Sequence, residues 1–446
     1  MILPPVARPH KPSSPPVATA AGLLKYLREV LGKGLERVVD DRHAGRIDIA
    51  TDAVLRAVLG GFLLGIGSIR GVEDRLRQSP AFRRFVGCQV ISDDGMRDVL
   101  SRVAHGGLLA ALHDTGKRAL LRWRAGRHAE CELARRLRPL DCSHLTARAV
   151  VALDGHETFC TEKTACADCH TRTKTVKRGG KLVQVEERYH FIVVAQHIGV
   201  HPATVLDVER VAPGEGEVTA AYRLVARLGR IYGPAVGVVV ADALHDHEPF
   251  RTACREAGFR SVVRHKREDR QPGSGLKRRL EARRPSPRTK PDGWHRDNRR
   301  GYTYAYWVEQ EPHSGRRYVE VHRTDAKGGV MTGGCVTDLP ADFAPAMAVA
   351  IIMEARWWIE NTGFHELAGQ LNLDRAFVHQ GRATGAWAIV LLALLAYNVW
   401  QMYLYRHLGL DPKKPRRTWG DLRRDLWESL HHLLRRGFLG SSPRCR

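Results

Sequence analysis

Apolar residues recur at three- and four-residue spacing through the N-terminal part of the chain, a pattern typical of amphipathic helices. The clearest segments are Leu23–Leu35, Val54–Leu64 and Val99–Leu121. Ser92, followed by two aspartates, is a typical N-cap for one of these helices. We therefore expect a helical domain over residues 21–140, behind a proline-rich disordered tail over residues 1–20. Its scattered arginines fit a DNA-binding bundle, and the pattern fits a plain support domain equally well.

The pattern changes to Val- and Ile-rich runs of strand length after residue 145, with helical segments between the later ones. This alternation predicts a mixed α/β sheet over residues 145–265. The predicted strands are Ala149–Leu153, Tyr189–Ile198, Ala203–Val208, Val236–Ala241 and Ser261–Arg264, and the predicted helices are Glu217–Leu228 and Asp246–Ala257.

A segment rich in lysine and arginine interrupts the sheet pattern at residues 266–336 and ends in an expected hairpin, Gly301–Trp307 with Arg317–Arg323. We interpret it as a basic, β-containing insertion. The helical pattern of residues 337–408 would complete the core, and residues 409–446 form a basic C-terminal tail. The apolar run Ala386–Trp400 spans only about fifteen residues, which suits a buried core helix better than a membrane span.

Composition narrows the choice of partner. The 446 residues carry a net charge of +23 with a pI near 10.0, which favours a polyanionic ligand such as nucleic acid. The N-terminus lacks the apolar stretch of a secretory signal, so we expect a cytoplasmic protein without a membrane partner. Nine cysteines in such a chain indicate reduced thiols or metal ligands rather than a disulfide framework.

Three acidic residues stand at positions suited to a metal site. Asp154 and Asp242 each follow an apolar, strand-like run, and Glu360 lies on an expected helix four residues after Arg356. Carboxylates brought together in this way can hold two divalent cations that act on a phosphodiester. Taken singly, each aspartate could be a turn or cap residue, and Glu360 could form only a surface ion pair with Arg356.

In this order, and with a basic insertion before the third acid, the chain resembles the DDE transposases of bacterial insertion sequences, which have a ribonuclease-H-like core. The resemblance covers roughly residues 145–405. It rests on the motifs Leu153-Asp154-Gly155-His156-Glu157, Val240-Ala241-Asp242-Ala243-Leu244, Thr337-Asp338-Leu339-Pro340, Arg356-Trp357-Trp358-Ile359-Glu360-Asn361 and His379-Gln380-Gly381, and on the helix Leu391–Asn398.

The resemblance implies an α/β fold with a ribonuclease-H-like mixed sheet, a β-rich basic insertion and a preceding helical domain. It implies Mg²⁺ (or Mn²⁺) held by Asp154, Asp242 and Glu360, and double-stranded DNA that is cut at the element ends and joined to a target. A homodimer in the DNA complex is expected. Two alternatives stay open: a ribonuclease-H-fold nuclease or resolvase without strand transfer, and a non-catalytic zinc-containing DNA-binding protein.

One branch of this family carries a Tyr-x2-Arg-x3-Glu-x6-Lys signature around the third acid. Arg356 and Glu360 match it, but Met353 and Leu367 replace the tyrosine and the lysine. This departure puts a hairpin-forming excision pathway in doubt. Arg356 and Asn361 are expected to contact DNA.

The loop after the first acid is a possible zinc site. Cys166 and Cys169 have the spacing at which two thiolates share one Zn²⁺, and Cys160 with His170 could complete a tetrahedral set. Cys142 and His190 are also within reach. The alternative is a loop of reduced cysteines that binds no metal.

Basic residues of the insertion are expected to lie beside the acids and to clamp phosphates, unless they belong to a solvated loop. They are Arg278, Arg279, Arg283, Arg284, Arg288 and Lys290.

Overall fold

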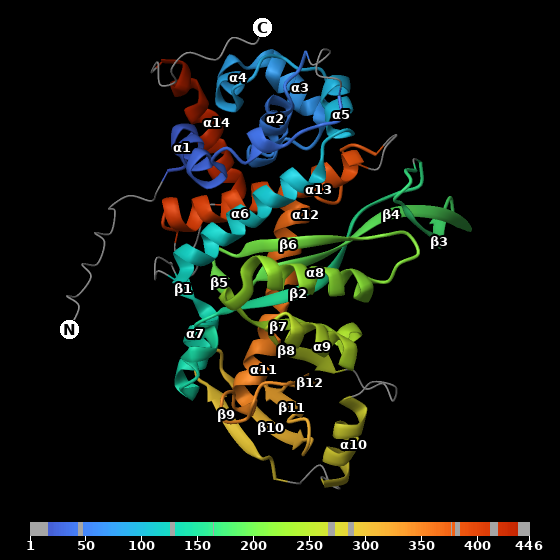
Figure 1. Cartoon of the computed structure of the whole chain (residues 1–446), viewed down its shortest axis with the longest axis vertical. Helices are drawn as coiled ribbons and strands as arrows, with labels where there is room; N and C mark the ends of the chain where they lie inside the picture. Colours follow the sequence, from blue (N-terminus) through green and yellow to red (C-terminus); the bar gives the residue numbers. More distant parts are fainter. Residues whose placement is uncertain are drawn as a thin grey trace, which may run out of the picture.

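The computed structural model of the chain is shown in Figure 1. It describes residues 17–42, 48–124, 130–163, 165–265, 273–283, 290–375, 377–379, 384–410 and 418–435. Arg284, Arg288, the Gln380-Gly381 pair and most of the expected N-terminal tail lie outside the described residues.

The N-terminal part of the described chain is helical, as the spacing of its apolar residues predicts. The elements are α1 (Ala20–Leu31), the 3-10 turn η1 (Leu35–Arg37), α2 (Thr51–Leu63), α3 (Ile69–Gln78), α4 (Pro80–Val86), α5 (Asp93–Leu100) and α6 (His105–Arg124). The Ser92 hydroxyl caps α5 by accepting a hydrogen bond from the Gly95 N–H at 3.2 Å. The single helix expected over Val99–Leu121 is divided, because the chain turns after α5 and Val103 forms a β-bridge with Asp40.

The C-terminal part of the chain joins this helical layer. Helix α14 (Trp419–Arg435) packs against α1 and α4, and Figure 1 shows it in red beside the blue N-terminal helices. Its residues Leu422, Leu426 and Leu430 are buried. The structure thus differs from the expected basic tail over residues 409–446, since three leucines at helical spacing bury one face of α14. The Ala20 N–H, at the end of the expected N-terminal tail, donates to the Ser429 hydroxyl at 2.7 Å.

A ten-stranded mixed sheet forms the centre of the molecule. In its first half, β6 (Thr204–Val211), β4 (Lys181–His197) and β2 (Ala149–Thr161) are antiparallel neighbours. Next to β2, β7 (Val236–Ala241) and β8 (Arg260–His265) run parallel to it. Helices α8 (Glu217–Tyr232) and α9 (Glu248–Glu256) precede β7 and β8. The strand order and directions are those of a ribonuclease-H-like core, so the expected fold class is confirmed.

An arm extends from this core. Strand β3 (His170–Arg178) pairs with the first half of β4, and the hairpin projects from the sheet at the right of Figure 1. Its two-residue turn is Gly179-Gly180, with φ of 55° and 82°, a left-handed backbone that favours glycine. The sequence pattern did not predict β3, because its side chains are mostly exposed and polar.

A separate two-stranded sheet lies away from the arm. Strand β1 (Glu130–Cys131) pairs antiparallel with β5 (Val200–His201), and helix α7 (Glu132–Leu137) follows β1 directly in sequence. The Leu133 N–H donates to the Gly199 carbonyl at 3.0 Å, which extends the contact from β1 into the start of α7. This pairing ties the segment between the helical layer and β2 to the end of β4.

Strand β2 shows how the sheet is buried on both faces. Val151 and Leu153 pack with α8 and α9, whereas Val150 and Ala152 belong to the core on the opposite face, formed with α11 (Ala346–Ala355) and α13 (Thr384–Met402). Successive side chains of a strand point to opposite faces, so a strand covered on both sides is continuously apolar. This explains why the run before Asp154 contains no polar residue.

The insertion continues the same sheet. It consists of α10 (Gly273–Arg283), β9 (Gly293–Asp297), β10 (Tyr302–Gln310), β11 (Arg317–Thr324) and β12 (Val330–Thr337). Strand β12 pairs antiparallel with β8, and the order continues through β11 and β10 to β9. Helix α10 packs Leu276 and Leu280 against Trp307 and Tyr318. The hairpin expected between residues 301 and 323 corresponds to β10 and β11.

The second part of the core is helical. Helix α11 leads through the π-helical turn η7 (Ile359–Phe364) into α12 (His365–Leu371), and α13 continues into η8 (Tyr403–His407). Within the described residues, the segment Thr384–His407 is long and apolar enough to span a membrane, yet 94% of its most apolar window is buried in the protein. In the middle of this segment, the Asn398 side chain accepts a hydrogen bond from the Val205 N–H at 2.8 Å and donates one to the Val205 carbonyl at 2.7 Å. The segment is thus bound to the edge of the sheet.

Candidate functional site

The register of the central strands brings Asp154 and Asp242 together. Strand β2 runs past Asp154 to Thr161, so this aspartate does not end its strand as the sequence suggested. Parallel pairing with β7 stops at Ala152, which is opposite Val240. Asp154 and Asp242 each follow two residues later, and Asp242 directly succeeds the last residue of β7. Adjacent strands are about 4.8 Å apart, so the two carboxylates emerge side by side.

Asp242 is held in its ionised form. It is the N-cap of the 3-10 turn η6 (Ala243–His245), where it accepts hydrogen bonds from the Leu244 N–H at 2.9 Å and from His245 Nδ1 at 3.0 Å. Burial opposes ionisation, but the His245 and Leu244 hydrogen bonds outweigh it and lower the pKa of Asp242. The residue is therefore a carboxylate with a fixed orientation.

Arg356 forms ion pairs with both Asp154 and Glu360. The Arg356 guanidinium contacts Asp154 Oδ2 at 3.1 Å and Glu360 Oε1 at 2.5 Å, and it stacks on the Trp357 ring at 5.2 Å. Arg356 is only 3% exposed. Glu360 lies in the π-helical turn η7, an element that occurs frequently at functional sites. One buried cation thus joins the first and third predicted acids.

A fourth carboxylate, Glu217, completes the group and was not predicted from the sequence. It is the first residue of α8, and its carboxylate faces the backbone of Gly155, whose N–H donates a hydrogen bond to Asp154 Oδ1 at 3.2 Å. A Cβ at Gly155 would come within 2.6 Å of Glu217 Oε2, so glycine allows this close approach. Ligand atoms of Glu217, Asp242 and His245 lie within 4.8 Å of one another. An acid in the first turn of a helix is common, so nothing in the sequence singles Glu217 out.

Burial and neighbouring carboxylates raise the proton affinity of two of these acids, Asp154 and Glu217. Burial raises the pKa of Asp154 to about 7; Arg356 opposes the shift, while Glu360, Asp242 and Glu217 add to it. The pKa of Glu217 is also raised, mainly by burial. Such a group of carboxylates needs a compensating cation, and carboxylate oxygens are the ligands that Mg²⁺ and Mn²⁺ prefer. The donor set therefore fits divalent metal binding.

The residues expected to contact DNA occupy different environments. Asn361 is exposed next to Glu360, whereas Arg356 is buried among the acids. At the two departures from the family signature, Leu367 is fully buried and Met353 is half-buried against the core.

The described arginines of helix α10 do not lie beside the acids. Arg279 and Arg283 are on α10, which packs on β10 and β11 and lies at the lower edge of Figure 1. Strand β11 is four strand positions from β2, or about 19 Å at the usual spacing. Arg283 pairs with Asp292 at 2.8 Å and Arg279 with Glu309 at 3.5 Å. Any contact of these side chains with DNA would therefore be with a flanking segment.

A second cluster of metal-binding side chains lies at the base of the β3–β4 arm. It contains Cys166, Cys169, His190 and His379, whose ligand atoms are all within 4.8 Å of one another. Burial, with a smaller effect of His379, lowers the pKa of His190 to about 4, so its imidazole is neutral. Burial and the neighbouring thiol raise the pKa of Cys166 to about 12 in the absence of a cation.

Two of the expected zinc ligands, Cys160 and His170, are not part of this cluster. Both pair with Tyr189, Cys160 across β2–β4 and His170 across β3–β4. Directly paired residues present their side chains on the same face, and His190, the next residue of β4, points to the opposite face. Cys160 instead contacts Glu157, and His170 Nε2 bonds to the Val211 carbonyl at 3.0 Å. Of the expected set, only the two closely spaced cysteines belong to the cluster.

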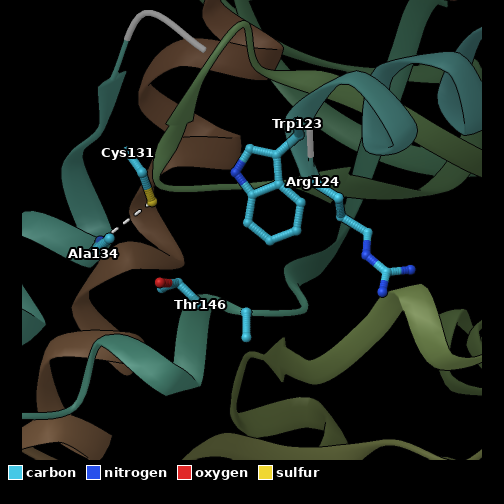
Figure 2. Close-up of a pocket in the computed structure, with 6 residues that line it drawn as sticks. Trp123, Arg124, Cys131, Ala134 and Thr146 are labelled. Carbon is cyan, nitrogen blue, oxygen red and sulfur yellow. Dashed lines mark hydrogen bonds between the residues drawn. The ribbon is translucent and has the colours of Figure 1, made fainter. Parts of the chain in front are cut away.

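A separate hollow of about 390 Å³ lies between the end of α6 and α7 (Figure 2). Its lining includes Trp123, Arg124 and Cys131, and the Cys131 Sγ accepts a hydrogen bond from the Ala134 N–H at 3.2 Å. None of the four acids or of the Cys–His cluster lines it, so we assign it no part in the chemistry.

Comparison with known proteins identifies the family of this chain. No curated protein matches the sequence. A cryo-EM structure of a piggyBac transposase synaptic complex with hairpin DNA is similar at 11% identity and a TM-score of 0.40, over 95% of this chain and 83% of that chain. The profile of the family described as "Transposase DDE domain" matches residues 150–399, more than half of the chain and the whole span from Asp154 to Glu360. The protein therefore belongs to the DDE-domain transposase family.

Proposed function

We propose that the protein cleaves DNA at the ends of a mobile element and joins the freed 3′ ends to target DNA, with Asp154, Asp242 and Glu360 as its metal-binding catalytic residues. The observation that carries the proposal is the meeting of these three acids, from two adjacent parallel strands and a π-helical turn, in a ribonuclease-H-like core.

Asp154 is the shared ligand in this proposal. Its neighbours are Asp242 on one side and, through Arg356, Glu360 on the other. When bound, Mg²⁺ or Mn²⁺ would supply an activated water or 3′-hydroxyl and would neutralise the departing oxygen. Before a metal binds, Arg356 offsets part of the negative charge of Asp154 and Glu360 and holds both carboxylates by ion pairs.

Glu217 and His245 act as positioning residues for Asp242. His245 is fully buried and donates to Asp242 through Nδ1, while its Nε2 lies 4.0 Å from Glu217 Oε1. The orientation of Asp242 is therefore fixed before a metal binds, and such preorganisation limits the reorganisation needed during reaction.

A cluster of arginines around Glu354, less than two helical turns before Glu360, offers a contact surface for DNA. Arg136, Arg323 and Arg300 lie 2.5, 3.3 and 3.8 Å from the Glu354 carboxylate, and the Tyr304 hydroxyl donates to it at 3.4 Å. Three guanidinium groups sharing one carboxylate leave a net positive charge. Glu354 precedes Glu360 by six residues on continuous helical backbone, or about 9 Å along the axis.

Asn361, beside the acids, would add a contact to this surface, and the exposed Lys290, two residues before Asp292, would add one beside α10. Helix α10, with Arg278, Arg279 and Arg283, would hold flanking DNA. A homodimer that pairs two DNA ends in the cytoplasm, at the nucleoid, completes the proposal.

The test is cleavage and joining of supercoiled plasmid DNA that carries the sequences flanking the gene. Asp154→Asn, Asp242→Asn and Glu360→Gln should each lower cleavage roughly 100- to 1,000-fold or more, because each removes an anionic ligand at nearly constant size. Asp74→Asn is the matched control, since Asp74 is a surface acid that pairs with Arg70 at 3.5 Å.

Near wild-type cleavage by any of the three variants would remove that residue from the catalytic set. Cleavage without any joined product would favour a nuclease or resolvase over a transposase. DNA binding should persist in all three variants.

A further inference from the structure

The Cys–His cluster draws its four side chains from three separate segments. Cys166 and Cys169 lie in the turn between β2 and β3, His190 is in β4, and His379 comes from the segment between α12 and α13. Cys169 and His379 are 210 residues apart in sequence. Folding therefore assembles these four ligands from distant parts of the chain into one small volume.

Two of the four distances match the edges of a coordination tetrahedron, and the other two are about 0.5 Å shorter. With Zn–S near 2.3 Å and Zn–N near 2.0–2.1 Å, two sulfurs would be about 3.8 Å apart, and a sulfur and a nitrogen about 3.6 Å. The two Sγ atoms are 3.7 Å apart, and the His190 Nε2 lies 3.1 and 3.6 Å from Cys166 and Cys169 Sγ. The His379 Nε2 is 3.0 Å from Cys169 Sγ. A centre among the four atoms is thus within bonding reach of each.

A disulfide, or isolated hydrogen bonds, would explain fewer of these distances than a bound zinc ion does. A disulfide would bring the two sulfurs to about 2.05 Å, far below the observed 3.7 Å. Thiol–imidazole hydrogen bonds would explain single short contacts, but not the convergence of both nitrogens and both sulfurs on one point. The turn itself is preformed, since the Cys166 N–H donates to Cys169 Sγ at 3.3 Å.

Packing around the two histidines fixes their rings. Phe159 stacks on His190 with centroids 5.0 Å apart and meets the His379 ring edge-on at 4.7 Å. The two histidines are 7% and 6% exposed. Their Nε2 atoms therefore point at the thiols from a rigid, mostly apolar setting, as ligands of a permanent metal would.

We propose that Cys166, Cys169, His190 and His379 bind one Zn²⁺ in a closed, structural site. Two thiolates and two imidazoles suit zinc, and four protein ligands leave no open position for water or substrate. The site connects the base of the β3–β4 arm, which follows the strand of Asp154, to the segment that follows the Glu360 helix. This proposal is independent of the DNA chemistry above.

The test is metal analysis of the full-length protein, purified under reducing conditions without chelator, by inductively coupled plasma mass spectrometry. We expect about one zinc per chain in the wild type and in Cys160→Ser, because Cys160 lies on the other face of the sheet. Cys166→Ser with Cys169→Ser, and His379→Ala alone, should reduce the zinc content to near zero.

Two further measurements keep the test decisive if a variant folds poorly. His379→Cys should keep zinc, because a thiolate can replace the imidazole, and replacing zinc by Co²⁺ in the wild type should give the intense visible bands of tetrahedral cobalt. Wild-type protein with near-zero zinc would overturn the proposal. Equal loss of zinc from Cys160→Ser and from the double variant Cys166→Ser with Cys169→Ser would also overturn it.

Discussion

Two groups of candidate metal ligands lie along β2, and they differ in ligand type, openness and charge. The acidic group around Asp154 is made of oxygen ligands, is partly open and relies on Arg356 to balance its charge. The Cys–His cluster at the arm is made of sulfur and nitrogen ligands, is closed and has neutral imidazole partners. The first arrangement suits an ion that must exchange and meet a substrate, whereas the second suits an ion that stays.

The largest effect should come from removing the exchangeable ion. Dialysis into Mg²⁺-free buffer should lower DNA cleavage roughly 100- to 1,000-fold or more, and renewed Mg²⁺ should restore it. Zinc measured in the same dialysed sample should stay near one per chain. Loss of zinc in parallel with activity would contradict the distinction between an exchangeable and a permanent site.

The next effect concerns stability. Removing the thiols with Cys166→Ser and Cys169→Ser should lower the free energy of unfolding by about 4 kcal/mol, the value for an ion present at 1,000 times its Kd. Chemical denaturation with and without added zinc measures it, with Cys160→Ser as the control. A double variant as stable as Cys160→Ser would show that the cluster holds no structural metal.

A smaller and pH-dependent effect is expected at Asp154. Its pKa is raised above the ordinary 3.8 to about 7, so the folded state binds this proton more tightly than the unfolded state. Its stabilising contribution is therefore complete below about pH 4 and is lost as the pH rises to about 7, when no Mg²⁺ is present.

The substitution Asp154→Asn removes the pH dependence of stability that comes from Asp154. The variant should gain about 2 to 4 kcal/mol relative to wild type between about pH 5 and pH 8 in Mg²⁺-free buffer. Urea unfolding at a series of pH values measures the difference. A difference that does not change with pH would mean that Asp154 titrates normally.

The smallest expected effect is on the salt dependence of DNA binding by the arginines around Glu354. Arg300→Ala with Arg323→Ala should flatten the dependence of log K on log salt by up to about 1.8, roughly 0.9 for each phosphate contact. Cleavage of bound DNA should also fall, because these side chains surround Glu354, which lies less than two helical turns before Glu360. Arg278→Ala with Arg279→Ala on α10 should reduce the slope similarly and leave cleavage of bound DNA unchanged. An unchanged salt dependence in both double variants would show that DNA contacts neither group of arginines.

The parts of this molecule that could be predicted well from the sequence are those set by local pattern. Asp154 and Asp242 could be found because continuous apolar runs precede them, and Glu360 because it follows a recognisable motif. The roles of Glu217 and His379 could not be identified in the same way, because they arise from strand register and from contacts between distant segments. Strand β3 was missed because its side chains are mostly exposed, and α14 because its many arginines hid three buried leucines.

The pairing of β12 with β8 makes the core and its insertion one continuous sheet. Neighbouring strands rotate by about 20–25° in a constant sense, so the five steps from β2 to β10 turn the strand direction by roughly 100° or more. Duplex DNA resists bending over about 150 base pairs, so a straight duplex aligned with the strands at the acids cannot also be aligned with those beneath α10. The angle of the insertion is thus set by the twist of the sheet, and DNA held by α10 would be either a bent duplex or a second one.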